Sequence, residues 1–356
     1  MTHVFVAPHP DDVALSCGGL IANLRELGQN VAIITVFSGT GDSGSLSGYQ
    51  REALGFGSKA VWPNTVAFNR ANVGNDYPSF IEGQAAPWLA TDEGLAATQA
   101  AADASARRFW QRASWYRRAD IHAGAATGPD DVPQQGAVLT DELVAARMAG
   151  DVMASRRLED ERFAAFAEAA VVFLDLPDAV FRGYEGDEQL LGEVRADDQA
   201  PVGILRTEIA RLEPQKVYLP LGVGGHVDHQ LMRQVGIALL AAREDWVMPG
   251  PRYAGAVTFY EDFPYAYWSE FTRLEDLPAG ALAGIPSGVA LTPEYAATSE
   301  VVERKIRGIA LYESQMDRLF TGVDAMGDAV RAHAERVGRQ AGIPGGAERY
   351  WATSLL

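Results

Sequence analysis

The feature that most constrains the fold is a strand–helix–strand pattern near the start of the chain. Residues 4–7 form an apolar run, residues 13–27 carry a helical pattern, and residues 31–37 form a second apolar, β-branched run. Gly28 follows the helical pattern, and glycine commonly takes the left-handed conformation that closes a helix. Two strands joined through a helix pair in parallel, with a right-handed crossover. We therefore expect an α/β fold.

The same alternation returns near residue 150. Strands are predicted at residues 171–176, 216–221 and 256–260. Helices are predicted at residues 141–170, 201–212, 298–316 and 324–340, and a further helix follows residue 230 and ends at about residue 244. We interpret residues 1–320 as one domain and residues 321–356 as a C-terminal helical extension.

Residues 42–150 lack this alternation of strands and helices. The stretch is rich in Gly, Ala, Asn and Pro, yet it contains four of the chain's seven tryptophans: Trp62, Trp88, Trp110 and Trp115. Disordered linkers are poor in aromatic residues, so we predict a folded insertion that serves as a lid or specificity segment. A helix expected over residues 91–118 carries five arginines: Arg107, Arg108, Arg112, Arg117 and Arg118. They form either a solvated basic face or a clamp for an anionic group of the substrate.

The composition narrows the class of partners. The net charge of −17 opposes binding to nucleic acid, which needs a basic face, and to anionic lipid. No apolar run approaches the roughly 18 residues of a membrane span, and the first strand leaves no room for a signal peptide, so we expect a cytoplasmic protein.

The single cysteine, Cys17, excludes an internal disulfide and is expected to be a buried, inert thiol.

Two short polar clusters each follow a predicted strand of the parallel sheet. Together they contain six residues that can carry chemistry: His9, Asp11, Asp12, His226, Asp228 and His229. In open α/β sheets, ligands bind outside the carboxyl ends of the strands. The two clusters are therefore expected to converge on one site, although they lie far apart in the sequence.

The residue types in these clusters match those of a catalytic metal centre. Catalytic zinc typically has three protein ligands drawn from His, Asp and Glu, and a water in the fourth position. His9, Asp12 and His229 supply such a set for Zn²⁺, with Fe²⁺ as the alternative in a mixed nitrogen and oxygen site. Asp11 stays free beside the metal, where its carboxylate can take a proton from water.

The second cluster offers two further roles. His226 can stabilise an oxyanion or protonate a leaving amine, and Asp228 can orient an imidazole. The competing interpretation is that these residues only form turns and cap helices, since Asp is a good N-cap. The occurrence of two such clusters, each after a strand and before a helix, favours the metal site.

The clusters resemble the signatures of the LmbE/PIG-L family of zinc-dependent N-acetylglucosaminyl deacetylases. His-Pro-Asp-Asp at 9–12 and His-Val-Asp-His at 226–229 carry the resemblance, and the stretches at 40–44, 156–161, 259–265 and 305–315 are similar to the family as well. The resemblance implies a Rossmann-like, mostly parallel sheet with helices on both faces. It also implies His9, Asp12 and His229 as zinc ligands, Asp11 as general base, and His226 as the electrophilic or acid histidine.

The chain departs from the family pattern at two positions. Val13 replaces the usual acidic residue after the paired aspartates, and Gly224 stands where some mycothiol-pathway relatives have a tyrosine. The large insertion has no counterpart that we recognise, which leaves the substrate open.

The leading hypothesis is metal-dependent removal of an N-acyl group, most simply N-acetyl, from an amino sugar or related small polar metabolite. The alternatives are an amidase that acts on a thiol conjugate or a natural-product intermediate, and a non-catalytic metal- or ligand-binding protein on the same scaffold. The glycines at 39, 41 and 44 match a dinucleotide-binding pattern by letter, but they follow the second strand instead of the first, so they favour a nucleotide-dependent oxidoreductase only weakly. The oligomeric state, including a homo-oligomer, stays open.

Overall fold

The computed structural model describes residues 1–39, 152–241, 256–268, 277 and 283–355. The described residues contain a seven-stranded sheet of order β3-β2-β1-β4-β5-β7-β6. Its strands are β1 (Thr2–Ala7), β2 (Asn30–Thr35), β3 (Ala170–Phe173), β4 (Lys216–Pro220), β5 (Val257–Tyr260), β6 (Val289–Ala297) and β7 (Ala347–Leu355). The first five pair in parallel, and β7 runs antiparallel to both of its neighbours. The expected mostly parallel α/β sheet is confirmed.

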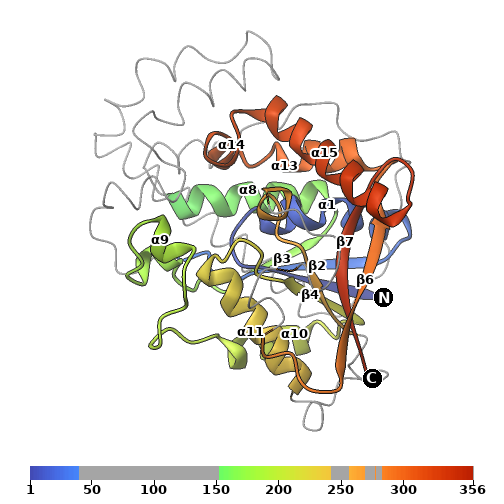
Figure 1. The fold of residues 1–356 in the computed structure, drawn as a ribbon. Helices are drawn as coiled ribbons and strands as arrows, with labels where there is room; N and C mark the ends of the chain where they lie inside the picture. The colour runs from blue at the N-terminus through green and yellow to red at the C-terminus, as the bar shows by residue number, and fades with distance from the viewer. Residues whose placement is uncertain (40–151, 242–255, 269–276, 278–282, 356) are drawn as a thin grey trace, which may run out of the picture.

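Helices cover both faces of this sheet (Figure 1). One face carries α1 (Asp12–Glu26), α8 (Val152–Phe166), α13 (Val302–Ile309), α14 (Glu313–Leu319) and α15 (Val323–Ala341). The other face carries α10 (Val202–Arg211) and α11 (Val227–Ala241). Short helical turns lie at η1 (Ala179–Phe181), α9 (Asp187–Leu190) and α12 (Tyr265–Trp268).

Burial on both faces explains the unbroken apolar runs of the central strands. In β1, Val4 and Val6 pack into the core beneath α10 and α11, whereas Phe5 and Ala7 pack into the core beneath α1 and α13. Parallel strands covered on both sides read as continuous apolar segments instead of alternating ones. Their ends are therefore easy to locate in the sequence.

The first helix follows its sequence signals. Gly28 has φ of +68°, and its N–H bonds the carbonyl of Arg25, as in a glycine-terminated helix. Cys17 on this helix is fully buried, and burial raises the pKa of its thiol well above the usual range. Among the described residues no helix combines the length and the apolar character that a membrane span requires.

The C-terminal part differs from the expected helical extension over residues 321–356. It contains the helix α15, but the chain then forms β7, which enters the central sheet between β5 and β6. β7 was missed because Glu348 and Arg349 interrupt its apolar pattern; both are buried in ion pairs, with Lys305 and Glu261 respectively.

Two further predicted segments do not coincide with single elements of the structure. The helix predicted over 298–316 is two helices, α13 and α14, with a short turn between them. The predicted insertion at 42–150, with its arginine-bearing helix, lies outside the described residues.

The buried ion pair of Lys305 with Glu348 yields a stability prediction. Lys305 Nζ lies 2.7 Å from Glu348 Oε1, and the same carboxylate accepts hydrogen bonds from the N–H groups of Gly19 and Leu20 and from the Tyr350 hydroxyl. Lys305→Met leaves that carboxylate buried without its cation, so we expect it to lower the free energy of unfolding by about 3–5 kcal/mol in urea titrations.

The matched control for this variant is Arg331→Met. Arg331 also pairs with a glutamate, Glu303, but both side chains are solvent-exposed, so its loss should leave the unfolding midpoint nearly unchanged. Equal midpoint shifts in the two variants would contradict the importance of the buried pair.

Candidate metal centre and active site

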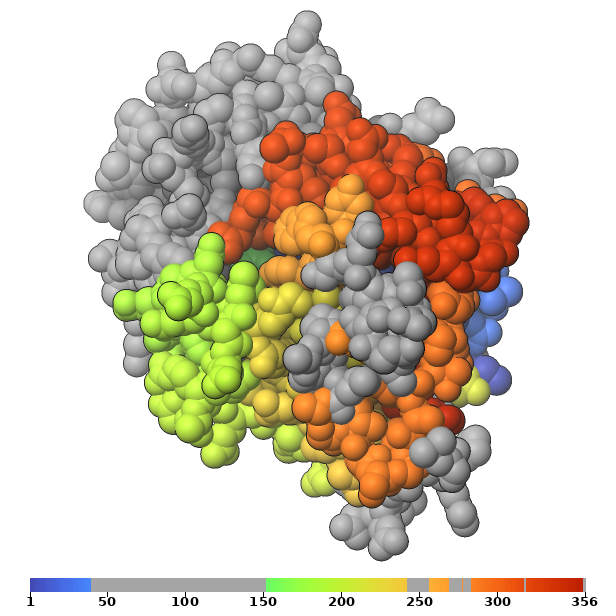
Figure 2. All heavy atoms as spheres, in the orientation of Figure 1, coloured from blue at the N-terminus to red at the C-terminus, as the bar shows by residue number. Residues whose placement is uncertain are grey.

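The site forms where the carboxyl ends of β1 and β4 lie side by side. These strands pair in parallel, in the register His3 with Lys216 to Phe5 with Tyr218, so the loops that follow them meet. Five of the six residues predicted from the two clusters line one pocket: His9, Asp11, Asp12, His226 and His229. The sixth, Asp228, is fully buried behind His9. Figure 2 shows a hollow on this face, bordered by the segment after β3 in light green and by C-terminal residues in red.

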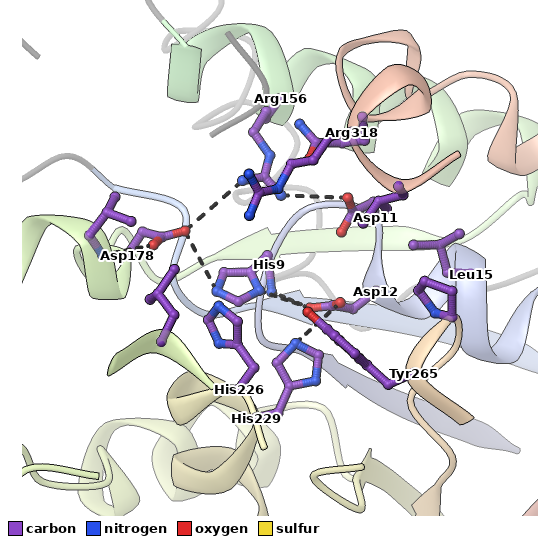
Figure 3. A pocket seen from close by; sticks show the side chains of 15 residues that line it. His9, Asp11, Asp12, Leu15, Arg156, Asp178, His226, His229, Tyr265 and Arg318 are labelled. Carbon is purple, nitrogen blue, oxygen red and sulfur yellow. Dashed lines mark hydrogen bonds and ion pairs between the residues drawn. The ribbon is translucent and has the colours of Figure 1, made fainter. Parts of the chain in front are cut away.

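Asp12 lies between two imidazoles (Figure 3). Its Oδ2 is 3.2 Å from His9 Nδ1, and its Oδ1 is 3.4 Å from His229 Nε2. Ligands held 2.0–2.1 Å from a tetrahedral zinc lie roughly 3.3 Å from one another. Both carboxylate–imidazole distances are close to this spacing, and ligand atoms of His9, His226 and His229 also lie within 4.8 Å of one another.

The far nitrogen of each imidazole is held by a second carboxylate. His9 Nε2 lies 2.9 Å from Asp228 Oδ2, and His229 Nδ1 lies 2.6 Å from Asp262 Oδ1. Metal-ligating histidines almost always donate their other N–H to such a group, which fixes the tautomer and the ring orientation. Asp262 follows β5, and the sequence interpretation assigned it no role although it lies in one of the family-like stretches.

Neighbouring charges determine the protonation of these groups. Burial lowers the pKa of His9, but Asp178, Asp12 and Asp228 outweigh this effect and raise it to about 9. Burial likewise raises the pKa of Asp12, but His229 and His9 outweigh it and hold that pKa well below its usual range. The carboxylates thus stabilise positive charge on the imidazoles, and they would stabilise a metal cation bound at the same site.

Asp11 occupies the N-cap position of α1 without acting as a cap. Its side chain makes no capping hydrogen bond, and its φ of +107° is unusual for a non-glycine residue. Strained backbone of this kind clusters at functional sites. The carboxylate faces Arg156, with Asp11 Oδ2 3.5 Å from Arg156 Nη2. Burial raises the pKa of Asp11, against the opposing effect of Arg156.

His226 is held by its own loop. The N–H of Asp228 donates to His226 Nδ1 over 3.3 Å, which leaves Nε2 as the nitrogen that carries the proton in the neutral ring. Burial lowers the pKa of His226 well below its usual range, and the neighbouring His9 and His229 lower it further. The neutral ring is a hydrogen-bond donor at the pocket, close to His9, with ring centroids 4.8 Å apart.

Other segments supply pocket residues to which the sequence interpretation gave no role. Arg156 comes from α8, Asp178 follows β3, Tyr265 follows β5, and Gln315 and Arg318 come from α14. Asp178 comes just after the carboxyl end of a parallel strand, so the rule that located the two clusters could also have found it. The residues from the helices carry no such signal.

Tyr265 packs on the bare backbone of Gly224, in the loop before His226. A Cβ built on Gly224 would come within 2.3 Å of Tyr265 Cγ, and Gly224 has φ of +88°. The Tyr265 ring also meets His229 edge to face, with centroids 5.9 Å apart. Only glycine allows this ring to close over the loop.

This contact predicts a coupled pair of substitutions. Gly224→Ala should destabilise the chain by about 1–2 kcal/mol from its left-handed backbone, plus the cost of the clash with Tyr265. A Tyr265→Ala background removes the ring contacts at 2.3 and 2.4 Å and leaves only the Cβ contact at 2.7 Å, so the cost of Gly224→Ala should be smaller. Urea unfolding of the four proteins in a double-mutant cycle measures the coupling, and an equal cost in both backgrounds would refute it.

Comparisons with known proteins identify similar sequences. Residues 4–60 match the family described as PIG-L, GlcNAc-PI de-N-acetylase. A 2'-N-acetylparomamine deacetylase of Streptomyces fradiae is 32% identical over 184 residues, which are 48% of this chain and 57% of that relative. The chain therefore spans little more than half the length of this curated relative.

Solved structures with the same fold include two deacetylases. The zinc-inhibited form of teicoplanin deacetylase Orf2 has a TM-score of 0.56 at 19% identity, covering 100% of this chain and 99% of that one. The A40926 pseudoaglycone deacetylase Dbv21 has a TM-score of 0.52 at 20% identity, covering 99% and 97%. At these identities the likeness shows a shared fold.

Proposed function

We propose that this chain, which carries a domain of the PIG-L/LmbE family, is a metal-dependent hydrolase that removes an N-acyl group, most simply N-acetyl, from an amino sugar or related polar metabolite. The observation that carries the proposal is the position of Asp12 between His9 and His229, whose outer nitrogens are each held by a buried carboxylate. The similarity to a deacetylase of 2'-N-acetylparomamine supports the same reaction class.

His9 through Nδ1, Asp12, and His229 through Nε2 would hold the metal. Zinc is the proposed ion, and Fe²⁺ is the alternative for a set of two nitrogens and a carboxylate. When bound, such an ion polarises a carbonyl and lowers the pKa of water towards 7.

Asp11 is the proposed general base. Its carboxylate lies next to Asp12 in the chain and lines the same pocket, but it faces Arg156 instead of the two imidazoles. Burial raises its pKa, which brings its proton affinity closer to neutrality, where a general base works best. Asp11 takes a proton from the attacking water and returns it to the nitrogen of the departing amine.

His226 is the proposed stabiliser of the developing oxyanion. With Nδ1 engaged by the Asp228 N–H, its Nε2–H is free to donate to the substrate carbonyl oxygen as that oxygen gains negative charge. The lowered pKa of His226 favours this neutral donor over the acid role that the sequence also left open.

The pocket residues beyond the metal ligands suit a polar substrate. Arg156, Asp178, Gln315 and Arg318 offer donors and acceptors for hydroxyl or amino groups, and Leu15 and Leu319 supply apolar walls. The net charge of −17 favours a neutral or cationic substrate over an anionic one, as expected for an amino sugar with other free amines.

Metal content and acetate release, measured together, test the proposal. The wild-type chain, loaded with Zn²⁺ or Fe²⁺, should hold about one metal per chain and release acetate from members of a panel of N-acetyl amino sugars. His229→Ala should lose the metal and the activity, whereas the surface variant Asp197→Asn should keep both. A well-folded wild type that binds no metal would sink the proposal. Turnover only on N-acylated thiol conjugates would favour the amidase alternative.

Asp11→Asn separates the base from the ligands. The amide has nearly the same shape but cannot take a proton, so kcat should fall by about 10²–10⁴-fold while the metal content stays at the wild-type value. Turnover equal to the wild type would remove Asp11 from the role of base.

A further inference from the structure

We propose that Arg182 is a positioning residue for the metal centre: it fixes Asp228, and through Asp228 it sets which nitrogen His9 presents to the metal. The inference rests on the proposed function above. Arg182 lies just after η1, does not line the pocket, and belongs to a segment to which the sequence interpretation assigned no role.

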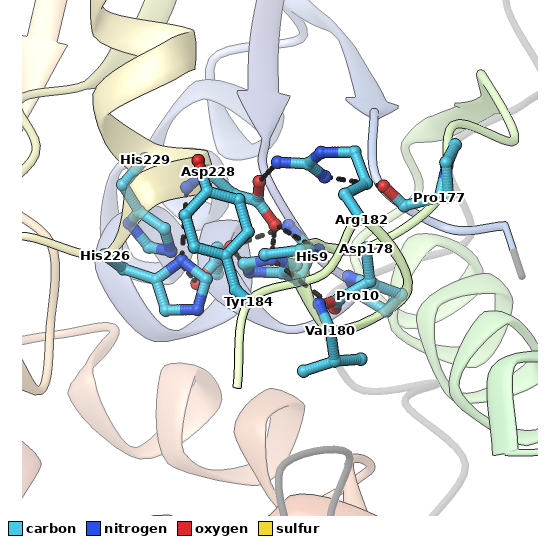
Figure 4. Close-up of polar contacts among 12 residues, drawn as sticks. His9, Pro10, Pro177, Asp178, Val180, Arg182, Tyr184, His226, Asp228 and His229 are labelled. Atoms are coloured by element: carbon cyan, nitrogen blue, oxygen red, sulfur yellow. Dashed lines mark hydrogen bonds and ion pairs between the residues drawn. The ribbon is translucent and has the colours of Figure 1, made fainter. Parts of the chain in front are cut away.

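Several groups hold the Arg182 guanidinium, and Figure 4 shows two of them, Asp228 and the Pro177 carbonyl. Nη2 donates to Asp228 Oδ1 and, over 2.9 Å, to Asp198 Oδ2. Nε donates to Asp198, and Nη1 donates to the Pro177 carbonyl over 2.6 Å. The guanidinium also lies over the Phe37 ring, 4.5 Å from its centroid. A planar fork with these fixed directions is a property of arginine that lysine does not share.

Asp228 depends on this contact for its own orientation. It is fully buried, and its Oδ2 accepts hydrogen bonds from the Ala179 N–H over 3.1 Å and from His9 Nε2 over 2.9 Å. Its other oxygen, Oδ1, is held by Arg182. Because each oxygen of the carboxylate has its own partner, its orientation is fixed. When a metal is bound, His9 would therefore keep its proton on Nε2 and present the Nδ1 lone pair on the Asp12 side.

Arg182 also favours one of two possible cation positions. The first is the proposed metal site beside Asp12, and the second lies on the other side of His9. Ligand atoms of His9, Asp178 and Asp228 lie within 4.8 Å of one another, as a metal site would require. The guanidinium puts a positive charge directly against Asp228, which opposes a cation at that second place. Arg182 thereby keeps the metal on the Asp12 side of His9.

The test is the metal affinity of the apo chain, measured by competition with a zinc-chelating dye. Arg182→Met should weaken Zn²⁺ binding by about 10–100-fold, the usual effect of losing a partner that orients a ligand. Arg182→Lys keeps the charge without the fork, so its affinity should lie between those of Arg182→Met and the wild type. Circular dichroism checks that each variant is folded.

Two controls separate positioning from general loosening. Arg195 lies in the same segment and bonds Asp197 and the carbonyls of Arg182 and Gly183, but these contacts do not include Asp228. The variant Arg195→Met should therefore bind Zn²⁺ as the wild type does. In an Asp228→Asn background, Arg182→Met should cause little further loss, because the pathway to His9 is already broken.

The outcomes are distinct. Unchanged affinity in Arg182→Met, equal loss in Arg195→Met, or full additivity with Asp228→Asn would overturn the inference while leaving the proposed function intact. A wild-type chain that binds neither Zn²⁺ nor Fe²⁺ would overturn the proposed function and the inference together.

Discussion

The contact of Asp12 with both His9 and His229 is the constraint on which the site depends, and it exists only because β1 and β4 are neighbours in the sheet. Their parallel register brings the loops after Ala7 and Pro220 to the same edge. The Asp12 carboxylate then spans the gap between imidazoles that belong to different loops. A shift of β4 by one residue would turn its side chains to the opposite faces and separate the two halves of the site.

The polar groups of the site are buried, so their arrangement depends on partners. Asp228 and Asp262 each bind one imidazole and also accept backbone N–H groups, from Ala179 and from Gly222 and Val223 respectively. These backbone bonds hold the carboxylates before any metal arrives. Because buried charge without a partner is costly, the site is rigid only as a complete network.

Sequence patterns located the central strands and the chemically active clusters, for a clear physical reason. The strands β1, β2, β4 and β5 are covered on both faces and read as apolar runs, and polar residues just after such runs stand out. The antiparallel pair β6 and β7 was missed, because Glu348 and Arg349 are buried in ion pairs and β6 carries Pro293 at the edge of the sheet. The charges of Glu348 and Arg349 are compensated by residues that are remote in the chain, so no local sequence pattern indicates that they can be buried.

The sequence by itself determined the parallel α/β fold and which residue types could form a metal site, because both depend on local order: an apolar strand, then a polar turn, then a helix. The tertiary structure decided which nitrogen of each histidine faces Asp12, that Asp11 faces Arg156, and that Asp178, Arg182 and Asp262 join the site. Those choices depend on contacts between segments that are remote in the chain, where only the packing of the sheet and its covering helices brings the side chains within bonding distance.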